Sequence, residues 1–281
     1  MLLFKNAATL KSHISSLYKK EQLGLVPTMG ALHQGHAALV ERAVRENEYV
    51  VVSIFVNPTQ FDNKNDLDNY PQTLNADMTL LKGISKDIMI FAPTVAEVYE
   101  NEVAAKVYDF EGLDRVMEGA FRDNHFNGVG TIVETLLRLV APNNAYFGEK
   151  DFQQLQIIKK MVKLQELPVT IVGCPIVREP SGLAMSSRNE RLSKTVRKDA
   201  SFIYKTLAAA KKKFGTKSAK KVMQWVSEQF QKHPELELEY IEIADSETLT
   251  PTLKKQQNRK YRAFVAVYAE DVRLIDNIAL N

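Results

Sequence analysis

Cysteine is almost absent from this sequence, which has one, Cys174, among 281 residues. A single cysteine cannot form an internal disulfide. Its position in the apolar run at residues 171–177 predicts a small buried side chain in a reducing compartment. We therefore expect a cytoplasmic protein.

Long hydrophobic runs and an excess of one charge are also lacking. The first four residues are apolar, which is too short for the core of a signal peptide, and no run approaches the length of a membrane span. The formal net charge is only +3, so we expect no general role at nucleic acids or at membrane surfaces. The remaining composition is typical of a globular protein with one large or two modest domains.

Several familiar site signatures are missing as well. The sequence has no G-x-x-x-x-G-K-[ST] phosphate loop and no complete G-x-G-x-x-G dinucleotide fingerprint. His13, His125 and His233 are scattered, so no set of zinc ligands stands at the usual spacing. Metal binding by the pair His33 and His36 is therefore not expected.

Strand and helix patterns alternate through the first two thirds of the chain. Apolar runs predict strands at 23–26, 49–56, 88–91, 145–147 and 169–177, and helical spacing predicts helices at 35–47, 70–82, 128–140 and up to 167. The unbroken run at 49–56 is typical of a strand buried on both faces. This order predicts an α/β fold, a Rossmann-like doubly wound parallel sheet, over residues 1–178.

The pattern changes after residue 178. Two helices, at 194–214 and 219–232, precede two strands at 236–244 and 261–268 whose alternation suits an antiparallel sheet with one solvated face. We expect a smaller α+β domain at 179–281 that serves as a lid. The lysines between 211 and 221 favour a solvated helix end, and a site for an acidic partner is the alternative.

One turn stands out as a candidate site. It follows the first long strand and comprises Met29, Gly30, Ala31, Leu32, His33, Gln34, Gly35 and His36. A strand, a glycine-containing turn and a helix N-terminus together direct backbone N–H groups toward an anion. The two histidines can each donate a further hydrogen bond to a phosphate oxygen. The alternative is that a histidine here merely caps the helix.

Three further polar stretches follow other strands, and each has a structural alternative. Asn57 to Gln60 offers two amides or forms a plain Asn-Pro turn. Residues 148–154 contain Lys150, which could neutralise phosphate, whereas Asp151 and Gln154 are also spaced as a capping pair. Residues 185–189 place two hydroxyls and a guanidinium in one loop, with Ser187 and Glu190 as the capping alternative. Carboxyl ends of parallel strands share one edge, so the coincidence favours a ligand site.

The four stretches, in this order between residues 27 and 189, resemble the pantoate–β-alanine ligase (pantothenate synthetase) family of the H-x-G-H nucleotidylyltransferase superfamily. The resembling segments read PTMGALHQGH from Pro27, FVNPTQF from Phe55, GEKDFQQ from Gly148 and MSSRN from Met185. The C-terminal third adds little. The resemblance implies ATP-dependent condensation of pantoate with β-alanine through a pantoyl adenylate.

The resemblance also implies roles for individual residues. His36, His33, Lys150 and Arg188 would be catalytic, with His36 as the proton donor. Gln60, Gln154, Met29 and Asn57 would bind pantoate. ATP would contact residues 29–36 together with Gly148, Glu149, Lys150, Asp151, Val177, Met185, Ser186, Ser187 and Arg188.

Cofactor and partner expectations follow the same resemblance. ATP is the co-substrate and Mg²⁺ the metal, with Asp77 as its one candidate protein contact and the phosphates and water as its main ligands. The family suggests a homodimer, with pantoate and β-alanine as small-molecule partners and neither nucleic acid nor membrane. One alternative is a nucleotidylyltransferase that acts on a phosphate acceptor, although the two glutamine-bearing motifs argue against it. Another is an RNA-binding module, which the small net charge disfavours.

Overall fold

The computed structural model describes residues 1–17, 22–62, 64–99 and 102–281. The chain forms two compact units. The first comprises residues 1–114, 122–149 and 154–175, and the second comprises 115–121, 150–153 and 176–281. The division expected at residue 178, with a lid beyond it, stays a prediction.

A six-stranded parallel sheet forms the centre of the first unit, in the order β1-β4-β3-β2-β5-β6. The chain leaves β2 toward β3 and β4 and then returns to β5 on the other side of β2. The order of the strands therefore reverses between β2 and β5, where open α/β sheets bind their ligands. The strands are β1 Leu2–Phe4, β2 Leu23–Thr28, β3 Tyr49–Ile54, β4 Met89–Phe91, β5 Asn144–Gly148 and β6 Thr170–Cys174.

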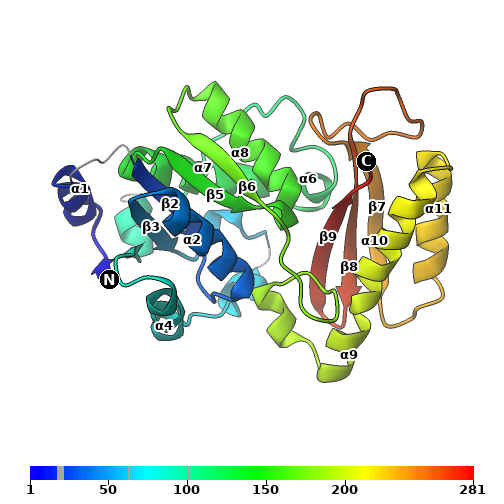
Figure 1. The fold of residues 1–281 in the computed structure, drawn as a ribbon, viewed down its shortest axis with the longest axis horizontal. Helices are drawn as coiled ribbons and strands as arrows, with labels where there is room; N and C mark the ends of the chain where they lie inside the picture. Colours follow the sequence, from blue (N-terminus) through cyan, green and yellow to red (C-terminus); the bar gives the residue numbers. More distant parts are fainter. Residues whose placement is uncertain (18–21, 63, 100–101) are drawn as a thin grey trace. The chain divides into compact units, whose positions relative to one another are not determined.

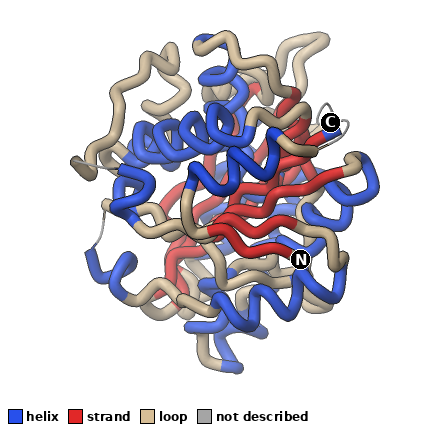
Figure 2. The backbone as a smooth tube through the Cα atoms, turned by 90° about the vertical axis from the view of Figure 1, so that its left-hand side faces the viewer, coloured by secondary structure: helices blue, strands red, loops and turns tan. Residues whose placement is uncertain are grey.

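Helices surround this sheet (Figure 2). One face packs against α2 and α4, which contribute Leu39, Val40 and Leu81 to a buried cluster with residues of β2, β3 and β4. Residues of the opposite face, such as Leu25 and Val51, are equally buried. The helices up to residue 164 are α1 Ala7–Ser15, α2 Gln34–Glu46, α3 Lys64–Asp68, α4 Leu74–Ile84, α5 Val95–Tyr99, α6 Glu118–Phe121, α7 His125–Val140 and α8 Phe152–Leu164, with 3-10 turns η2 Pro58–Gln60 and η3 Glu149–Asp151.

The predicted α/β class is confirmed for this unit, with small corrections. Strand β3 is buried along its middle, as predicted, and Cys174 is buried and free. Burial raises the pKa of the Cys174 thiol, although Arg42 lies beside it. Strand β1 was not predicted. Helix α4 begins at Leu74 rather than at residue 70, because Pro71 biases the residue before it toward an extended conformation.

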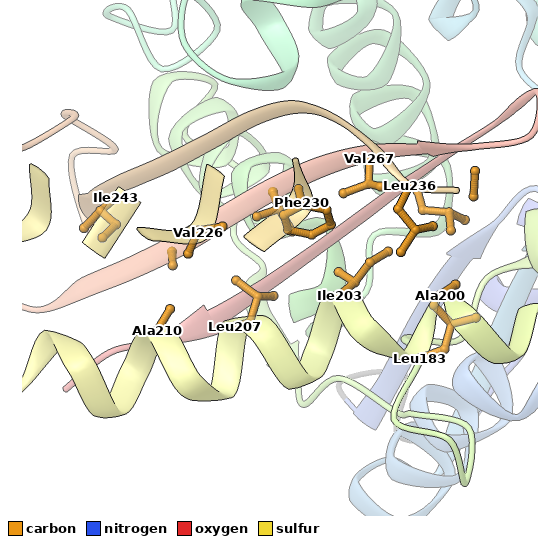
Figure 3. Close-up of a cluster of buried hydrophobic side chains, with 14 of the residues drawn as sticks. Leu183, Ala200, Ile203, Leu207, Ala210, Val226, Phe230, Leu236, Ile243 and Val267 are labelled. Carbon is orange, nitrogen blue, oxygen red and sulfur yellow. The ribbon is translucent and has the colours of Figure 1, made fainter. Parts of the chain in front are cut away.

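The second unit contains a three-stranded antiparallel sheet, β7-β8-β9, with helices α10 and α11 along one face (Figure 1). Figure 3 shows the core of this unit, where Ile203 and Leu207 of α10 and Phe230 of α11 meet Val267 of β8. The elements are η4 Ser187–Arg191, α9 Lys194–Asp199, α10 Ser201–Phe214, α11 Ala219–Phe230, β7 Glu237–Asp245, β8 Tyr261–Ala269 and β9 Val272–Ala279.

Three expectations for this unit were wrong. The helix predicted at 194–214 is interrupted at Ala200, whose N–H bonds to the carbonyls of both Val196 and Lys198. A third strand, β9, was missed because Asp276 and Asn277 interrupt its apolar pattern. The sheet has no solvated face at β8, where all residues but Tyr268 are buried.

None of the helices in the described ranges is long and apolar enough to cross a membrane.

Candidate active site

The turn after β2 adopts a backbone that its sequence makes possible. Gly30 and Ala31 both have positive φ angles, 83° and 50°. A Cβ atom on Gly30 would lie 3.0 Å from the Ile54 side chain and 3.1 Å from the Asp77 carboxylate, so both the conformation and the space require glycine. The chain then enters the N-terminus of α2, beside the carboxyl ends of the adjacent strands β2 and β5.

Asp77 supports this turn through hydrogen bonds to its backbone. Its Oδ2 accepts the N–H of Ala31 at 3.1 Å, and its Oδ1 accepts the N–H of Leu32 at 2.8 Å and the hydroxyl of Thr73 at 3.0 Å. The side chain is 2% exposed. These bonds satisfy two backbone donors that the left-handed turn would otherwise bury without partners. Asp77 therefore holds the turn, a task that the sequence did not predict for it.

His33 and His36 form a capping box at the start of α2. Nδ1 of His33 accepts the N–H of Gly35 at 3.0 Å, and Nδ1 of His36 accepts the N–H of His33 at 3.4 Å. A ring nitrogen that accepts carries no proton, so in each neutral imidazole the proton is on Nε2. The ring centroids are 4.1 Å apart. The capping alternative is thus correct.

The second polar stretch forms the 3-10 turn η2 and brings three predicted residues together. Gln60 donates from Nε2 to the sulfur of Met29 at 2.7 Å, and its Oε1 accepts from Asn57 at 3.2 Å. The Asn57 amide also donates to the carbonyl of Gly128 and accepts from the hydroxyls of Thr59 and Tyr99. All four hydrogen-bonding positions of Asn57 are therefore filled, so it shapes the turn that presents Gln60.

Gln60 is positioned by the first turn of α7 and by the residues just before it. The sequence did not indicate this role. Arg122 lies 3.0 Å from Nε2 of His125, and Nδ1 of His125 lies 2.7 Å from the carbonyl of Gln60. Since arginine can only donate, Nδ1 of His125 carries the proton and donates to that carbonyl. Gly128 allows α7 to approach, because a Cβ there would lie 2.2 Å from the carbonyl oxygen of Thr59.

Tyr99 is a further residue that the sequence did not indicate. Its hydroxyl donates to Oδ1 of Asn57 and lies 2.8 Å from the hydroxyl of Thr59, which donates to the same oxygen. Burial raises the pKa of Tyr99, against the lowering effect of these two neighbours. No motif in the sequence links residues this far apart, and only the packing of the elements reveals them.

The third stretch, residues 148–154, divides between the two units. Gly148 ends β5, Glu149 belongs to the first unit with it, and Gln154 is half-buried in the first turn of α8. Lys150 and Asp151 belong to the second unit. The ammonium of Lys150 lies 3.5 Å from the Asp151 carboxylate, and both side chains are partly exposed.

The fourth stretch lies in the second unit, together with Val177. The carbonyl of Val177 accepts the N–H of Met185, and Arg178 pairs with Ala184 in an isolated β-bridge. Ser186 caps η4 by accepting the N–H of Arg188 at 3.2 Å. The cap is therefore one residue earlier than the Ser187 of the capping alternative. Ser187 is 9% exposed, and Arg188 is half-buried.

Comparisons with known proteins agree with one another. The family model described as pantoate-beta-alanine ligase matches residues 2–279. The pantothenate synthetase of Christiangramia forsetii is 57% identical over 261 residues, which is 93% of this chain and 92% of that protein. The pantothenate synthetase of Flavobacterium psychrophilum is 50% identical over the whole of both chains.

Solved structures give the same result. Pantothenate synthetase from Thermus thermophilus superposes with a TM-score of 0.92 at 42% identity, covering 100% of this chain and 99% of that one. Pantoate-beta-alanine ligase from Francisella tularensis, solved in complex with beta-gamma ATP and β-alanine, gives a TM-score of 0.81 at 35% identity and covers 100% and 98%. Sequence, fold and family model thus coincide over nearly the whole chain, and the protein belongs to the pantoate–β-alanine ligase family.

Proposed function

We propose that this ligase condenses pantoate with β-alanine in two steps through a pantoyl adenylate. In the first step, a carboxylate oxygen of pantoate attacks the α-phosphorus of ATP and pyrophosphate leaves. In the second step, the amine of β-alanine attacks the acyl carbon and AMP leaves. Family membership gives the overall reaction. The observation that supports the adenylate step is the capped H-x-G-H turn, which follows β2 where the order of the strands reverses between β2 and β5.

The two histidines would act on the phosphates of ATP. Both reactants of the first step are anions, so charge neutralisation and positioning dominate its barrier. With Nδ1 of each ring held by a backbone N–H, Nε2–H of His33 and of His36 is the donor for phosphate oxygens. We assign His36 as the proton donor to the departing pyrophosphate.

The remaining ATP contacts would come from the turn 29–36, from the loop after β5 and from residues 177–188. Lys150 and Arg188 would neutralise charge at the α-phosphorus and on pyrophosphate. Ser186 and Ser187 would hold phosphate oxygens, Asp151 the ribose, and the backbone at Val177 the adenine. Gly148, Glu149 and Met185 would complete the nucleotide contacts.

Pantoate would be bound by amides rather than by cations. Gln60 and Gln154 would bind its hydroxyls and carboxylate, and Met29 would pack on its dimethyl carbon. The hydrogen bonds of Gln60 to Asn57 and Met29 support this grouping. Because the amide of Asn57 is fully engaged, we propose that it acts on pantoate through Gln60. A phosphate acceptor would call for lysines and arginines in these places, and so the alternative transferase is disfavoured.

Mg²⁺ remains a prediction from the family resemblance. In the part of the chain that the structure describes, no group of three or more His, Cys, Asp or Glu side chains could hold a metal ion. Asp77, the one predicted ligand, already accepts three hydrogen bonds. These residues do not fit a protein-held ion, so Mg²⁺ would be bound by ATP phosphates and water. No step here depends on it.

A homodimer and a cytoplasmic location also remain predictions. Sedimentation equilibrium of the purified chain tests the first, with twice the mass of one chain expected. A monomer at micromolar concentration would contradict it.

The reaction class is tested by ATP–pyrophosphate exchange with pantoate present and β-alanine absent. Exchange that requires pantoate is expected, since formation of the acyl adenylate is reversible. Exchange without pantoate, or none from folded protein supplied with Mg²⁺, would contradict the adenylate step and the roles of Gln60 and Gln154.

A further inference from the structure

The loop that carries Lys150 is attached to the β7–β9 sheet within the second unit. Asn277 of β9 donates from Nδ2 to the carbonyl of Lys150 at 2.8 Å. Two residues further, the ring of Phe152 lies 6.0 Å from that of Phe264 and under the guanidinium of Arg262 at 3.9 Å. These contacts cover the sheet face opposite α10 and α11.

The amide of Asn277 can adopt only one orientation here. In the register of β8 and β9, Phe264 stands opposite Asn277 and Arg262 opposite Ala279, so these side chains share one face. Oδ1 of Asn277 accepts from the Arg262 guanidinium while Nδ2 donates to the Lys150 carbonyl. Arginine only donates and a carbonyl only accepts, so a flipped amide would lose both bonds. Asn277 is 2% exposed, and its side chain is held on both sides.

The preceding residue, Asp276, contacts a second segment of the proposed ATP site, and it does so from the other face of β9. Asp276 accepts two hydrogen bonds from Arg178, at 2.6 and 2.9 Å, and the guanidinium of Arg178 lies 3.8 Å from the ring centroid of Tyr204. Burial raises the pKa of Asp276, while Arg178 opposes that rise. Two adjacent polar residues of β9 thus fix the backbone at Lys150 and the segment that follows Val177.

We propose that Asn277 is a positioning residue for the adenylation step, acting through Lys150. This inference rests on the role proposed above for Lys150. The ammonium group of a lysine lies at the end of a long, flexible side chain. Its position therefore depends on how firmly the backbone of that residue is held. A displacement of about 1 Å can cost roughly 10²-fold in rate. The hydrogen bond from Asn277 is the described contact that fixes the carbonyl of Lys150 itself.

The test compares two isosteric substitutions. Asn277→Asp keeps an acceptor for Arg262 but replaces the donor to Lys150 with an acceptor. Asn281→Asp is the matched control, because Asn281 also donates to a backbone carbonyl, that of Arg259, and accepts from a backbone N–H, that of Tyr261. In pantoate-dependent ATP–pyrophosphate exchange, we expect N277D to lower kcat at least ~10-fold with pantoate KM unchanged, while N281D stays within about twofold of wild type.

A double-mutant cycle separates positioning from general stability. In a Lys150→Ala background, N277D is expected to have little further effect on exchange or on ATP affinity measured by calorimetry. Asn277→Ala, which removes both bonds without adding charge, should behave in the same way if N277D folds poorly. Equal losses in both backgrounds, or normal kcat for N277D and N277A, would overturn the inference. Absence of exchange in the wild type would instead contradict the proposed function.

Discussion

At the scale of single residues, His33 and His36 cap a helix and also have the chemical role proposed above. Their Nδ1 atoms cap the first turn of α2, and the same bonds place the proton of each neutral ring on Nε2. A cap of ionised aspartate would hold the helix equally well but would offer no donor hydrogen. The sequence motif located this pair, whereas the tautomer follows only from the geometry of the cap.

His36→Ala should lower the rate of adenylate formation by ~10²-fold or more, the usual effect of losing one donor to a developing charge. Pantoate-dependent ATP–pyrophosphate exchange measures it. His13→Ala provides a control, since His13 lies in α1 with its ring packed at a tilt against that of Phe4, centroid to centroid 5.2 Å. A near-normal rate for the His36 variant would remove this residue from the mechanism.

Gln60→Ala should raise the KM for pantoate about tenfold, as expected for loss of a hydrogen bond to a charged or hydroxyl group. ATP affinity should be unchanged, because Gln60 itself is not among the proposed ATP contacts. Steady-state kinetics with each substrate varied in turn decide the matter. Unchanged pantoate kinetics would leave Gln60 as a turn residue.

At the scale of elements, close approach between α7 and η2 shapes the proposed pantoate site. The backbone of Gly128 lies against the carbonyl of Thr59, and its own carbonyl accepts from Asn57. His125, one turn earlier in α7, secures the carbonyl of Gln60. A single helix face thus fixes the turn at several points.

Gly128→Ala should destabilise the protein by about 1–3 kcal/mol, because the added methyl group cannot fit beside Thr59 without moving the helix. It should also raise pantoate KM. Gly83→Ala in α4 is the matched control, with nothing within 4 Å of the new Cβ, and should stabilise by roughly 0.5–1 kcal/mol. Urea unfolding measures both, and equal stabilities of the two variants would contradict the argument.

The elements also show what a sequence can and cannot predict. Strands β2 to β6 were predicted because continuous apolar runs distinguish buried parallel strands, and the four polar stretches were located because they follow strands. Strand β9 was missed because Asp276 and Asn277 stand where an apolar pattern would be expected. The supporting residues Asp77, Tyr99 and His125 carry no local signal, since their partners lie on other elements.

At the scale of the whole molecule, one network around a buried carboxylate links the free energy of unfolding to pH. The hydroxyl of Tyr108 donates to Glu134 at 2.6 Å, and Lys106 and Arg138 bind the same carboxylate. Burial raises the pKa of Glu134, but these three donors outweigh it and lower the pKa overall. Its contribution to stability is therefore present above the unfolded pKa, about 4.3, and is lost as the pH falls through the folded value.

Tyr108→Phe should cost about 1.5–3 kcal/mol at pH 7, since it removes a hydrogen bond to a charged group. The pKa of Glu134 should rise, so acid unfolding should begin at a higher pH. Burial and the bond to Glu134 raise the pKa of Tyr108 itself, so the wild type should lose stability above about pH 10, where the unfolded tyrosine ionises. Unfolding in urea across pH 3–11 measures the free energy of unfolding of the wild type and of Tyr108→Phe, with Tyr49→Phe as control. An unchanged acid midpoint for Tyr108→Phe would contradict the role given to this hydrogen bond.

The position of Asn277 in the sequence has a consequence for the order of synthesis. Lys150 leaves the ribosome 127 residues before Asn277. At about 5–20 residues per second, the interval between them is roughly 6–25 s. Throughout that time the strand that holds the carbonyl of Lys150 does not yet exist. A nascent chain released before β9 is made would therefore present the carbonyl of Lys150 without its hydrogen bond from Asn277.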